Sequence, residues 1–210
     1  MATRFRDMEV RAAAKAQLLR HARSCADTLV IDELGIEHGA SRVDIAVING
    51  HIRGLEIKAD ADTLERLPRQ IEAYGRVVDR ATLIAAERHV ATALELLPDW
   101  WGVISVVRCG NGAVAFRRVR VERANRGIDR ITLARLLWRR EVIDLLVGLG
   151  QDPKLLERRR RPELYNDLVA VVSLPRLRRI VRDTLKERRN WRDRVRPSSY
   201  DGSFPPNAMC

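Results

Sequence analysis

The sequence is poor in cysteine and has no long apolar run. Its three cysteines, Cys25, Cys109 and Cys210, are widely spaced and form no CxxC or Cys/His cluster, which argues against a structural zinc site. An odd number of thiols suits a reducing compartment. Residues 1–24 are charged throughout and lack a signal-peptide core, and no segment approaches the roughly 20 apolar residues of a membrane span. We therefore expect a cytoplasmic protein with no membrane partner.

Several common catalytic patterns are also absent. The sequence has no Ser/His/Asp set, no glycine-rich loop that could cradle a phosphate and no dinucleotide-binding fingerprint. What it has in excess is positive charge, with a formal net charge of +11 and a pI of about 10.6. Such a balance favours an anionic partner, either nucleic acid or an acidic surface. A merely soluble, arginine-rich protein is the alternative.

The pattern of the chain changes near residue 127. Residues 1–127 alternate short apolar strands with amphipathic helices, which predicts an α/β domain with a central mixed sheet flanked by helices. Residues 128–196 are expected to form a basic helical extension of three helices, since residues 131–196 hold 18 Lys/Arg against 9 Asp/Glu. Residues 197–210 are rich in Pro, Ser and Gly, which predicts a disordered tail.

Within the α/β part we expect a first helix over residues 8–25 and a strand pair over 42–48 and 52–59. A helix should begin at about Leu67, because Pro68 suits a first turn. The rest should be a strand, a helix and two strands, in the segments ATLIAAE, RHVATALELLP, WGVISVVR and AVAFRRVR.

The expected strand pair in RVDIAVINGHIRGLEIK (42–58) holds three charges among apolar residues, namely Asp44, Glu56 and Lys58. Side chains alternate across a strand, so the odd-numbered residues should form an apolar face against a helix, and the even-numbered face holds these charges. A two-residue Asn-Gly loop would send Asp44 and Glu56 to opposite sides. A three-residue loop, such as a type I turn with a left-handed Gly50 in a G1 bulge, places them on one side. We predict this second register or an equivalent bulge.

Converging carboxylates would explain these charges. Two neighbouring carboxylates repel each other, and a Mg²⁺ or Mn²⁺ ion relieves the repulsion. Such an ion can polarise a phosphoryl oxygen and acidify a bound water, while a nearby lysine stabilises the growing charge. The spacing D-x11-E-x-K therefore supplies the parts for phosphodiester hydrolysis. The alternative from the residues alone is an edge-strand salt bridge among Asp44, Glu56 and Lys58.

This spacing resembles the PD-(D/E)XK nuclease motif, in which an Asp and an Asp/Glu-x-Lys lie on adjacent strands. Glu33 stands where many such nucleases have an acidic residue on the helix before the hairpin, and Gln70 and Tyr74 form the Q-x-x-x-Y of the RecB-like branch. The proline of the motif is replaced by Val43. The resemblance covers about residues 28–110, and part of that run is also similar to a small uncharacterised bacterial family named after a locus tag.

The resemblance implies a restriction-endonuclease-like fold and roles for single residues. Asp44 and Glu56 would bind Mg²⁺ or Mn²⁺, with the Ile57 carbonyl as a third ligand and Glu33 completing the site directly or through water. Lys58 would position the attacking water or stabilise the phosphate charge.

Two helix residues would support this site. Gln70 would brace it or touch the phosphate backbone, and Tyr74 would support it or contact DNA. Because they are four residues apart, they share a helix face. The alternatives are an exposed amide for Gln70 and plain core packing for Tyr74.

Further arginines are candidates for substrate binding. Arg42 could meet a phosphate or form an ion pair with Glu37. The basic run of Arg158, Arg159, Arg160 and Arg161 could track phosphates, or it could be a solvated helix face. Trp138 could stack on a base or pack between helices.

Together these features predict a metal-dependent nuclease whose partner is nucleic acid. DNA is the expected substrate, and RNA is left open. A homodimer or a protein partner is compatible with the sequence. The alternative is a non-catalytic module that kept the fold and binds nucleic acid or a partner.

Overall fold

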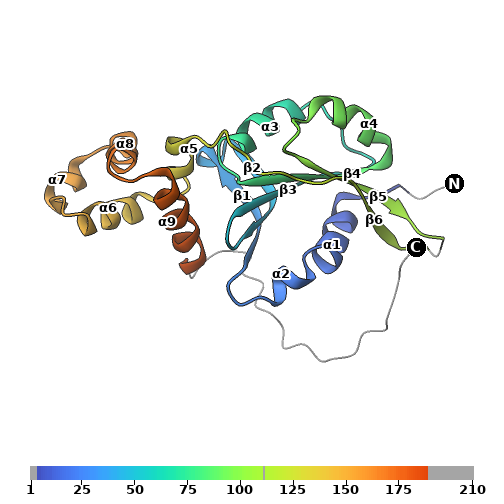
Figure 1. The fold of residues 1–210 in the computed structure, drawn as a ribbon, viewed down its shortest axis with the longest axis horizontal. Coiled ribbons are helices and arrows are strands. Elements are labelled where there is room, and N and C mark those ends of the chain that lie inside the picture. The colour runs from blue at the N-terminus through green and yellow to red at the C-terminus, as the bar shows by residue number, and fades with distance from the viewer. Residues whose placement is uncertain (1–3, 111, 189–210) are drawn as a thin grey trace.

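The computed structural model describes residues 4–110 and 112–188. Within them, six strands form one mixed sheet in sequential order from β1 to β6 (Figure 1). The strands are β1 (Leu29–Ile36), β2 (Ser41–Ile48), β3 (Ile52–Lys58), β4 (Arg80–Ala86), β5 (Gly102–Arg108) and β6 (Val114–Arg120). The helices are α1 (Asp7–Gln17), α2 (Arg20–Ser24), the 3-10 turn η1 (Glu37–Gly39), α3 (Leu67–Gly75), α4 (Glu87–Leu96), α5 (Arg130–Ala134), α6 (Arg139–Gly148), α7 (Pro153–Arg158), α8 (Arg161–Val171) and α9 (Leu174–Glu187).

Two kinds of connection build the sheet. β1, β2 and β3 run antiparallel through short turns, and β6 returns antiparallel beside β5. β3, β4 and β5 are parallel, so they need crossovers, which α3 and α4 supply. α3 and α4 cover one face of the sheet, while α1 and α2 cover the other (Figure 1). The prediction of an α/β fold with a mixed sheet, flanking helices and a C-terminal helical part is confirmed.

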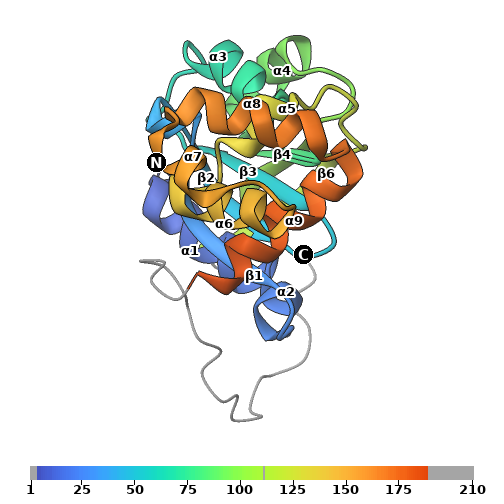
Figure 2. The same ribbon diagram turned by 90° about the vertical axis from the view of Figure 1, so that its left-hand side faces the viewer.

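The C-terminal helices α5 to α9 lie to one side of the sheet, and α9 contacts β2 (Figure 2). One cluster of buried apolar side chains runs from the sheet beneath α3 into these helices, where it includes Leu133, Leu146 and Leu177. A shared apolar core therefore holds the helical extension against the sheet. The division into domains near residue 127 stays a prediction.

Some elements differ from expectation. The helix predicted over 8–25 is broken between α1 and α2, and the three helices predicted in the extension are five shorter ones. Within the described residues, no helix has the length and apolar character needed to cross a bilayer. The tail predicted to be disordered, 197–210, lies outside the described residues.

The turn between β2 and β3 has the predicted three-residue length. Ile48 pairs with Ile52, so Asn49, Gly50 and His51 form the loop. The loop closes through the Asn49 N–H, which donates to the His51 carbonyl at 3.1 Å. The expected left-handed conformation of Gly50 is wrong, because Gly50 has no positive φ.

The predicted apolar face of the hairpin is correct except at Val43. Ile45, Leu55 and Ile57 belong to the cluster beneath α1, whereas Val43 belongs to the cluster on the opposite face. The alternation of β1 also reverses at Glu33, whose φ of 55° is left-handed. Because of this local break in the pleat, Val43 at the start of β2 faces the opposite side of the sheet from Ile45. No periodicity in the sequence indicates the break.

Candidate active site

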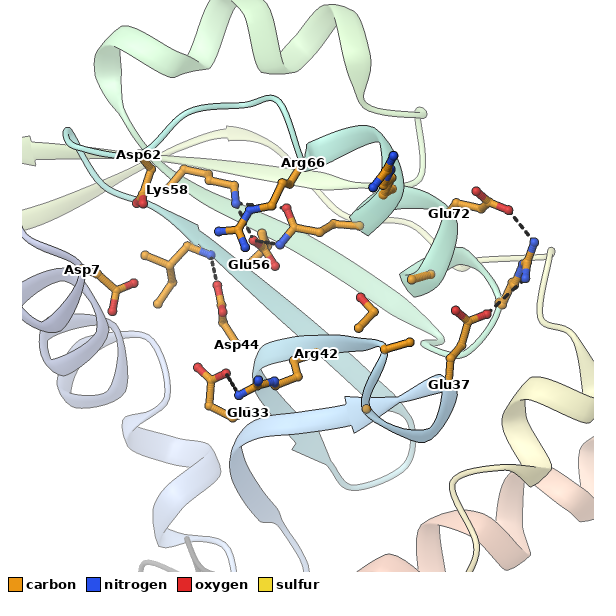
Figure 3. A pocket seen from close by; sticks show the side chains of 18 residues that line it. Asp7, Glu33, Glu37, Arg42, Asp44, Glu56, Lys58, Asp62, Arg66 and Glu72 are labelled. Carbon is orange, nitrogen blue, oxygen red and sulfur yellow. Dashed lines mark hydrogen bonds and ion pairs between the residues drawn. The ribbon is translucent and has the colours of Figure 1, made fainter. Parts of the chain in front are cut away.

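A cleft opens where β2 and β3 separate. Their pairing ends at Ile45 and Leu55, and beyond that point β3 pairs only with β4 while β2 pairs only with β1. The cleft has a volume of about 720 Å³, and its walls come from α1, η1, β2, β3 and α3 (Figure 3). The splayed strands thus expose side chains that a continuous ladder would have kept apart.

A hydrogen-bonded network surrounds Glu56, which is only 1% exposed. Its Oε1 accepts from Lys58 Nζ at 2.8 Å and from Gln70 Nε2 at 2.5 Å, and its Oε2 accepts from the Tyr74 hydroxyl at 2.7 Å. Lys58 Nζ also donates to Gln70 Oε1 at 3.0 Å. The structure therefore brings together Glu56, Lys58, Gln70 and Tyr74, as the sequence predicted.

Asp44 lies beside this network in the same cleft. Its Oδ2 accepts from the Ile57 N–H at 2.8 Å, and its own N–H donates to the Tyr74 hydroxyl at 3.3 Å. The predicted register is confirmed as far as Ile45 and Leu55. Beyond that point Asp44 is held from α1 and Glu56 from α3, and both carboxylates line the same cleft. β3 lies between β2 and β4, so an edge-strand salt bridge does not describe the site.

Burial shifts both carboxyl groups toward their neutral forms. Desolvation raises the pKa of Asp44 above its usual value, although the Ile57 N–H and the charges of Arg11 and Lys58 oppose the shift. Desolvation and then the charge of Asp44 raise the pKa of Glu56, against the attraction of Lys58. The two carboxylates thus repel each other, and nearby cations offset this only in part.

Tyr74 supports the site but cannot contact a substrate. The side chain is fully buried, and its ring packs against Trp101 with centroids 5.1 Å apart. Burial and then the charge of Glu56 raise its pKa well above 10, so the hydroxyl stays protonated and can donate. The prediction that Tyr74 contacts DNA is wrong. A side chain at Gly54 would collide with this ring, since an added Cβ would lie 2.8 Å from Tyr74 Cε1.

Glu33 lines the same cleft, but from a strand and not from a helix. The expected helix is wrong because this segment pairs antiparallel with β2. Its carboxylate lies 3.0 Å from Arg11 Nη2 and 3.8 Å from Arg42 Nη1. The predicted pairing of Arg42 with Glu37 is therefore replaced by contact with Glu33, while Glu37 pairs with Arg76 at 3.1 Å.

Arg11 of α1 is a site residue that the sequence did not reveal. Its Nη1 donates to the Asp44 carbonyl at 2.7 Å, and its Nη2 lies 3.4 Å from Asp44 Oδ1. It also contacts Asp7, Asp32 and Glu33, so one guanidinium meets four carboxylates. No motif could have singled it out in a chain with 39 Lys and Arg.

The predicted basic run does not reach the cleft. Arg158, Arg159, Arg160 and Arg161 are exposed, but none of them lines it. Arg66 and Arg69 line it instead, from the residue that caps α3 and from its first turn. Arg66 lies four residues before Gln70, and this spacing was a usable signal because residues three and four apart share a helix face.

The residues that could hold a metal are Asp44, Glu56 and the Ile57 carbonyl, with Glu33 nearby. Across 4–110 and 112–188, no group of three or more His, Cys, Asp or Glu is arranged to hold a metal ion. The donor set is thus two carboxylates and a backbone oxygen, which are hard ligands of the kind that Mg²⁺ and Mn²⁺ prefer.

Comparison with known proteins adds a family. Residues 2–196 match the family described as bacteriophage P4 protein cII. Protein cII of Enterobacteria phage P4 is 25% identical over 192 residues, which cover 90% of this chain and 69% of that protein. A solved protein of unknown function from Silicibacter pomeroyi has a TM-score of 0.42 and 19% identity, over 70% of this chain and 92% of its own. Because the family match spans almost the whole of the described structure, the chain belongs to the bacteriophage P4 protein cII family.

Proposed function

We propose that this protein is a metal-dependent nuclease with a restriction-endonuclease-like core, and that it hydrolyses phosphodiester bonds of DNA. The observation that carries the proposal is the convergence of Asp44, Glu56, Lys58, Gln70 and Tyr74 at one cleft. These residues come from β2, β3 and α3. The first three match the PD-(D/E)XK pattern, and the last two match the Q-x-x-x-Y pattern. Plain core packing would not explain why a polar network lines an open cleft.

A Mg²⁺ or Mn²⁺ ion would be held by Asp44, Glu56 and the Ile57 carbonyl, and Glu33 would reach it directly or through water. Desolvation and then the charge of Asp44 raise the pKa of Glu56, and this supports the fit because a cation would relieve the repulsion between the two carboxylates. When bound, the ion would polarise a phosphoryl oxygen and lower the pKa of a water molecule.

The chain's own residues would do the rest. Lys58 is held by Glu56 and Gln70, so its ammonium is positioned to stabilise charge on a phosphate or to orient a water. Tyr74 fixes the Glu56 carboxylate through its protonated hydroxyl. Arg66 and Arg69 would contact phosphates that enter the cleft.

The test is a cleavage assay on plasmid, linear DNA and RNA with Mg²⁺ or Mn²⁺. We expect wild-type protein to cut and Lys58→Ala to lose at least about 100-fold in rate, since it removes a preorganised charge from the reacting centre. Lys154→Ala, which changes an exposed lysine of α7, is the matched control and should cut normally. Removal of the ion with EDTA should stop cutting by wild type.

Loss of Lys58 leaves Glu56 buried without its cation, which can destabilise the fold. Asp44→Asn is therefore the second variant, because its side-chain oxygen can still accept from the Ile57 N–H. Equal activity in wild type, Lys58→Ala and Asp44→Asn would trace the cutting to a contaminant and overturn the proposal.

A second candidate is a non-catalytic module that binds nucleic acid or a protein partner. The observation that favours it is Arg11, whose guanidinium already neutralises Asp44 and Glu33. DNA binding without cutting under all metal conditions, together with no Mn²⁺ binding by calorimetry, would select this candidate.

A further inference from the structure

A second hollow lies between the sheet and the helical extension. It has a volume of about 240 Å³ and is bounded by the end of β1, η1, the segment between α5 and α6, and α8. Its polar lining residues include Arg135, Arg161 and His38, and no Asp or Glu lines it. The cleft differs sharply, because seven of its lining residues are acidic.

Three arginines line this pocket, and two of them, Arg135 and Arg161, have no ion-pair partner among the described residues. Neither Arg135 nor Arg161 forms an ion pair or a side-chain hydrogen bond in that part of the chain. Both stand close enough to Tyr165 for their charges to act on its hydroxyl. The charge of Arg135 also acts on Asp129, but no carboxylate within the described residues forms an ion pair with either guanidinium. Two guanidinium groups without such a partner beside one pocket attract an anion, and arginine suits phosphate geometry.

An aromatic ring stands at the same pocket. Trp138 is 56% exposed, although large apolar side chains are usually buried, and the guanidinium of Arg188 lies 4.2 Å from its ring centroid. Arg188 is fixed by Glu141, whose carboxylate accepts from its Nε and Nη2 at 2.7 Å each. The ring is therefore held by the Arg188 guanidinium that lies over it, while the residue as a whole stays exposed, which is the form of a stacking platform for an unpaired base.

The pocket adjoins the cleft through one strained turn. Glu37 lines the cleft, His38 lines the pocket and Gly39 lines both. All three residues have positive φ values, of 50°, 58° and 91°. Left-handed conformations cost free energy for residues other than glycine and are often retained at functional sites. Because Gly39 lines both hollows, they adjoin at this turn, and a single extended ligand could reach both.

We propose that this pocket binds a phosphate of a single-stranded nucleic acid, through Arg135 and Arg161, and that Trp138 stacks on an adjacent base. The inference rests on the proposed function in one respect, namely that the same strand continues into the cleft. A single strand is required because the bases of a duplex are already stacked on one another and cannot lie on the ring.

The test is fluorescence anisotropy with a labelled single-stranded DNA of 20 nucleotides and the matching duplex, in EDTA so that nothing is cut. We expect Arg135→Gln/Arg161→Gln to raise the Kd for the single strand at least tenfold. The slope of log Kd against log salt should also fall by about 0.7, since the variant loses one phosphate contact and each such contact contributes roughly 0.7. Arg176→Gln/Arg179→Gln, which removes the same charge from exposed positions of α9, is the matched control.

Trp138→Leu separates stacking from charge. It should weaken single-strand binding about fivefold or more and leave both the duplex affinity and the salt slope unchanged. Thermal melts of each variant would establish that the fold is retained.

The outcomes separate this inference from the nuclease proposal. If wild type cuts DNA but the pocket variants bind like the α9 control, only the inference is overturned. If the pocket variants lose binding and wild type never cuts, the inference stands and the nuclease proposal falls. An equal loss of single-strand affinity in the pocket and α9 variants would show that only the net charge of the protein matters. If the pocket variant still binds DNA but no longer binds a labelled poly-glutamate peptide, the pocket is assigned to an acidic protein partner. Each of these last two results overturns the inference.

Discussion

The cleft and the pocket share Gly39, yet their polar groups are arranged in opposite ways. In the cleft, carboxylates are dominant, and Glu56 is bound on both oxygens by Lys58, Gln70 and Tyr74. In the pocket, arginines are dominant, and two of them lack an acidic partner among the described residues. A tightly satisfied network suits groups that must be held in one geometry, and unpaired donors suit the capture of a ligand.

A buried tyrosine also belongs to each site, since Tyr165 lines the pocket and Tyr74 lies behind the cleft, bonded to Glu56. The two tyrosines make different hydrogen bonds. The Tyr74 hydroxyl donates to the Glu56 carboxylate at 2.7 Å, whereas the Tyr165 hydroxyl donates to the Leu137 carbonyl at 3.0 Å. A hydrogen bond to a charged group is typically about twice as strong as one between neutral groups. The comparison between the hollows can therefore be tested residue by residue.

The largest effect is expected at Glu56. Glu56→Gln replaces a proposed metal ligand and places an amide among the donors of Lys58 and Tyr74, so cleavage should fall by about 1000-fold. Glu72→Gln changes an exposed carboxylate of the same cleft and should leave the rate within about threefold. Rates of plasmid nicking measure both, and parallel losses in the two variants would show that Glu56 has no special role.

The next effect concerns the two tyrosines. Tyr74→Phe leaves a buried carboxylate oxygen without its donor, so we expect the free energy of unfolding to fall by about 1.5–3 kcal/mol. Tyr165→Phe removes a bond to a neutral carbonyl and should cost about 0.5–1.5 kcal/mol. Urea denaturation compares them. Only Tyr74→Phe should also slow cleavage. A larger loss of unfolding free energy in Tyr165→Phe than in Tyr74→Phe would contradict the difference between the two hydrogen bonds.

A smaller effect is expected at Arg11. Arg11→Met removes the guanidinium that neutralises Asp44 and Glu33 while keeping much of the apolar stem, so Mn²⁺ should bind several-fold more tightly. Calorimetric titration with Mn²⁺ measures this change. Arg4→Met, at an exposed position outside the cleft lining, is the control. Weaker Mn²⁺ binding in Arg11→Met would mean that Arg11 organises the acidic groups and does not compete for them.

The smallest effect is on the pH dependence of stability. Burial raises the pKa of Asp44 and of Glu56 above 3.8 and 4.5, so the folded protein holds protons that the unfolded chain has released. Their contribution to stability is therefore present below these pH values and is lost as pH rises through the folded pKa values. In EDTA, Asp44→Asn should be more stable than wild type at pH 7 and should converge with it near pH 4. Denaturation at several pH values checks this, and a gap that widens toward acid would contradict the sign.

Much of the site was predictable from local patterns. The three-residue loop between β2 and β3 followed from the requirement that Asp44 and Glu56 share a side, and α3 begins at Leu67, as the proline at its first turn indicated. The joining of Gln70 to Glu56 and Lys58 was expected from the resemblance to the Q-x-x-x-Y pattern, and the spacing added that Gln70 shares a helix face with Tyr74. The alternative of an exposed amide for Gln70 is wrong, because the amide is hydrogen-bonded to Glu56 and Lys58.

Other features could not be predicted because they arise from contacts between distant segments. Glu33 was expected on a helix, but its pairing with β2 made it a strand residue. Arg11 is 33 residues from Asp44 in the chain, and only the packing of α1 against the sheet brings them together. The basic run at 158–161 was expected at the substrate, yet the packing of α7 and α8 places it outside the cleft lining.

The resemblance to the PD-(D/E)XK and Q-x-x-x-Y patterns implied the clustering of Glu56, Lys58, Gln70 and Tyr74. By itself, the sequence determined the strands and helices between residues 42 and 120 and the register of the hairpin. These depend on periods of two and about four residues and on turn length, which are local properties. Only the tertiary structure decided that Arg11 meets Asp44, that Tyr74 is sealed from any substrate and that a basic pocket adjoins an acidic cleft. Those outcomes depend on which faces become buried together. Burial sets the solvent exposure of a group and the charges that surround it, and its neighbours in sequence determine neither.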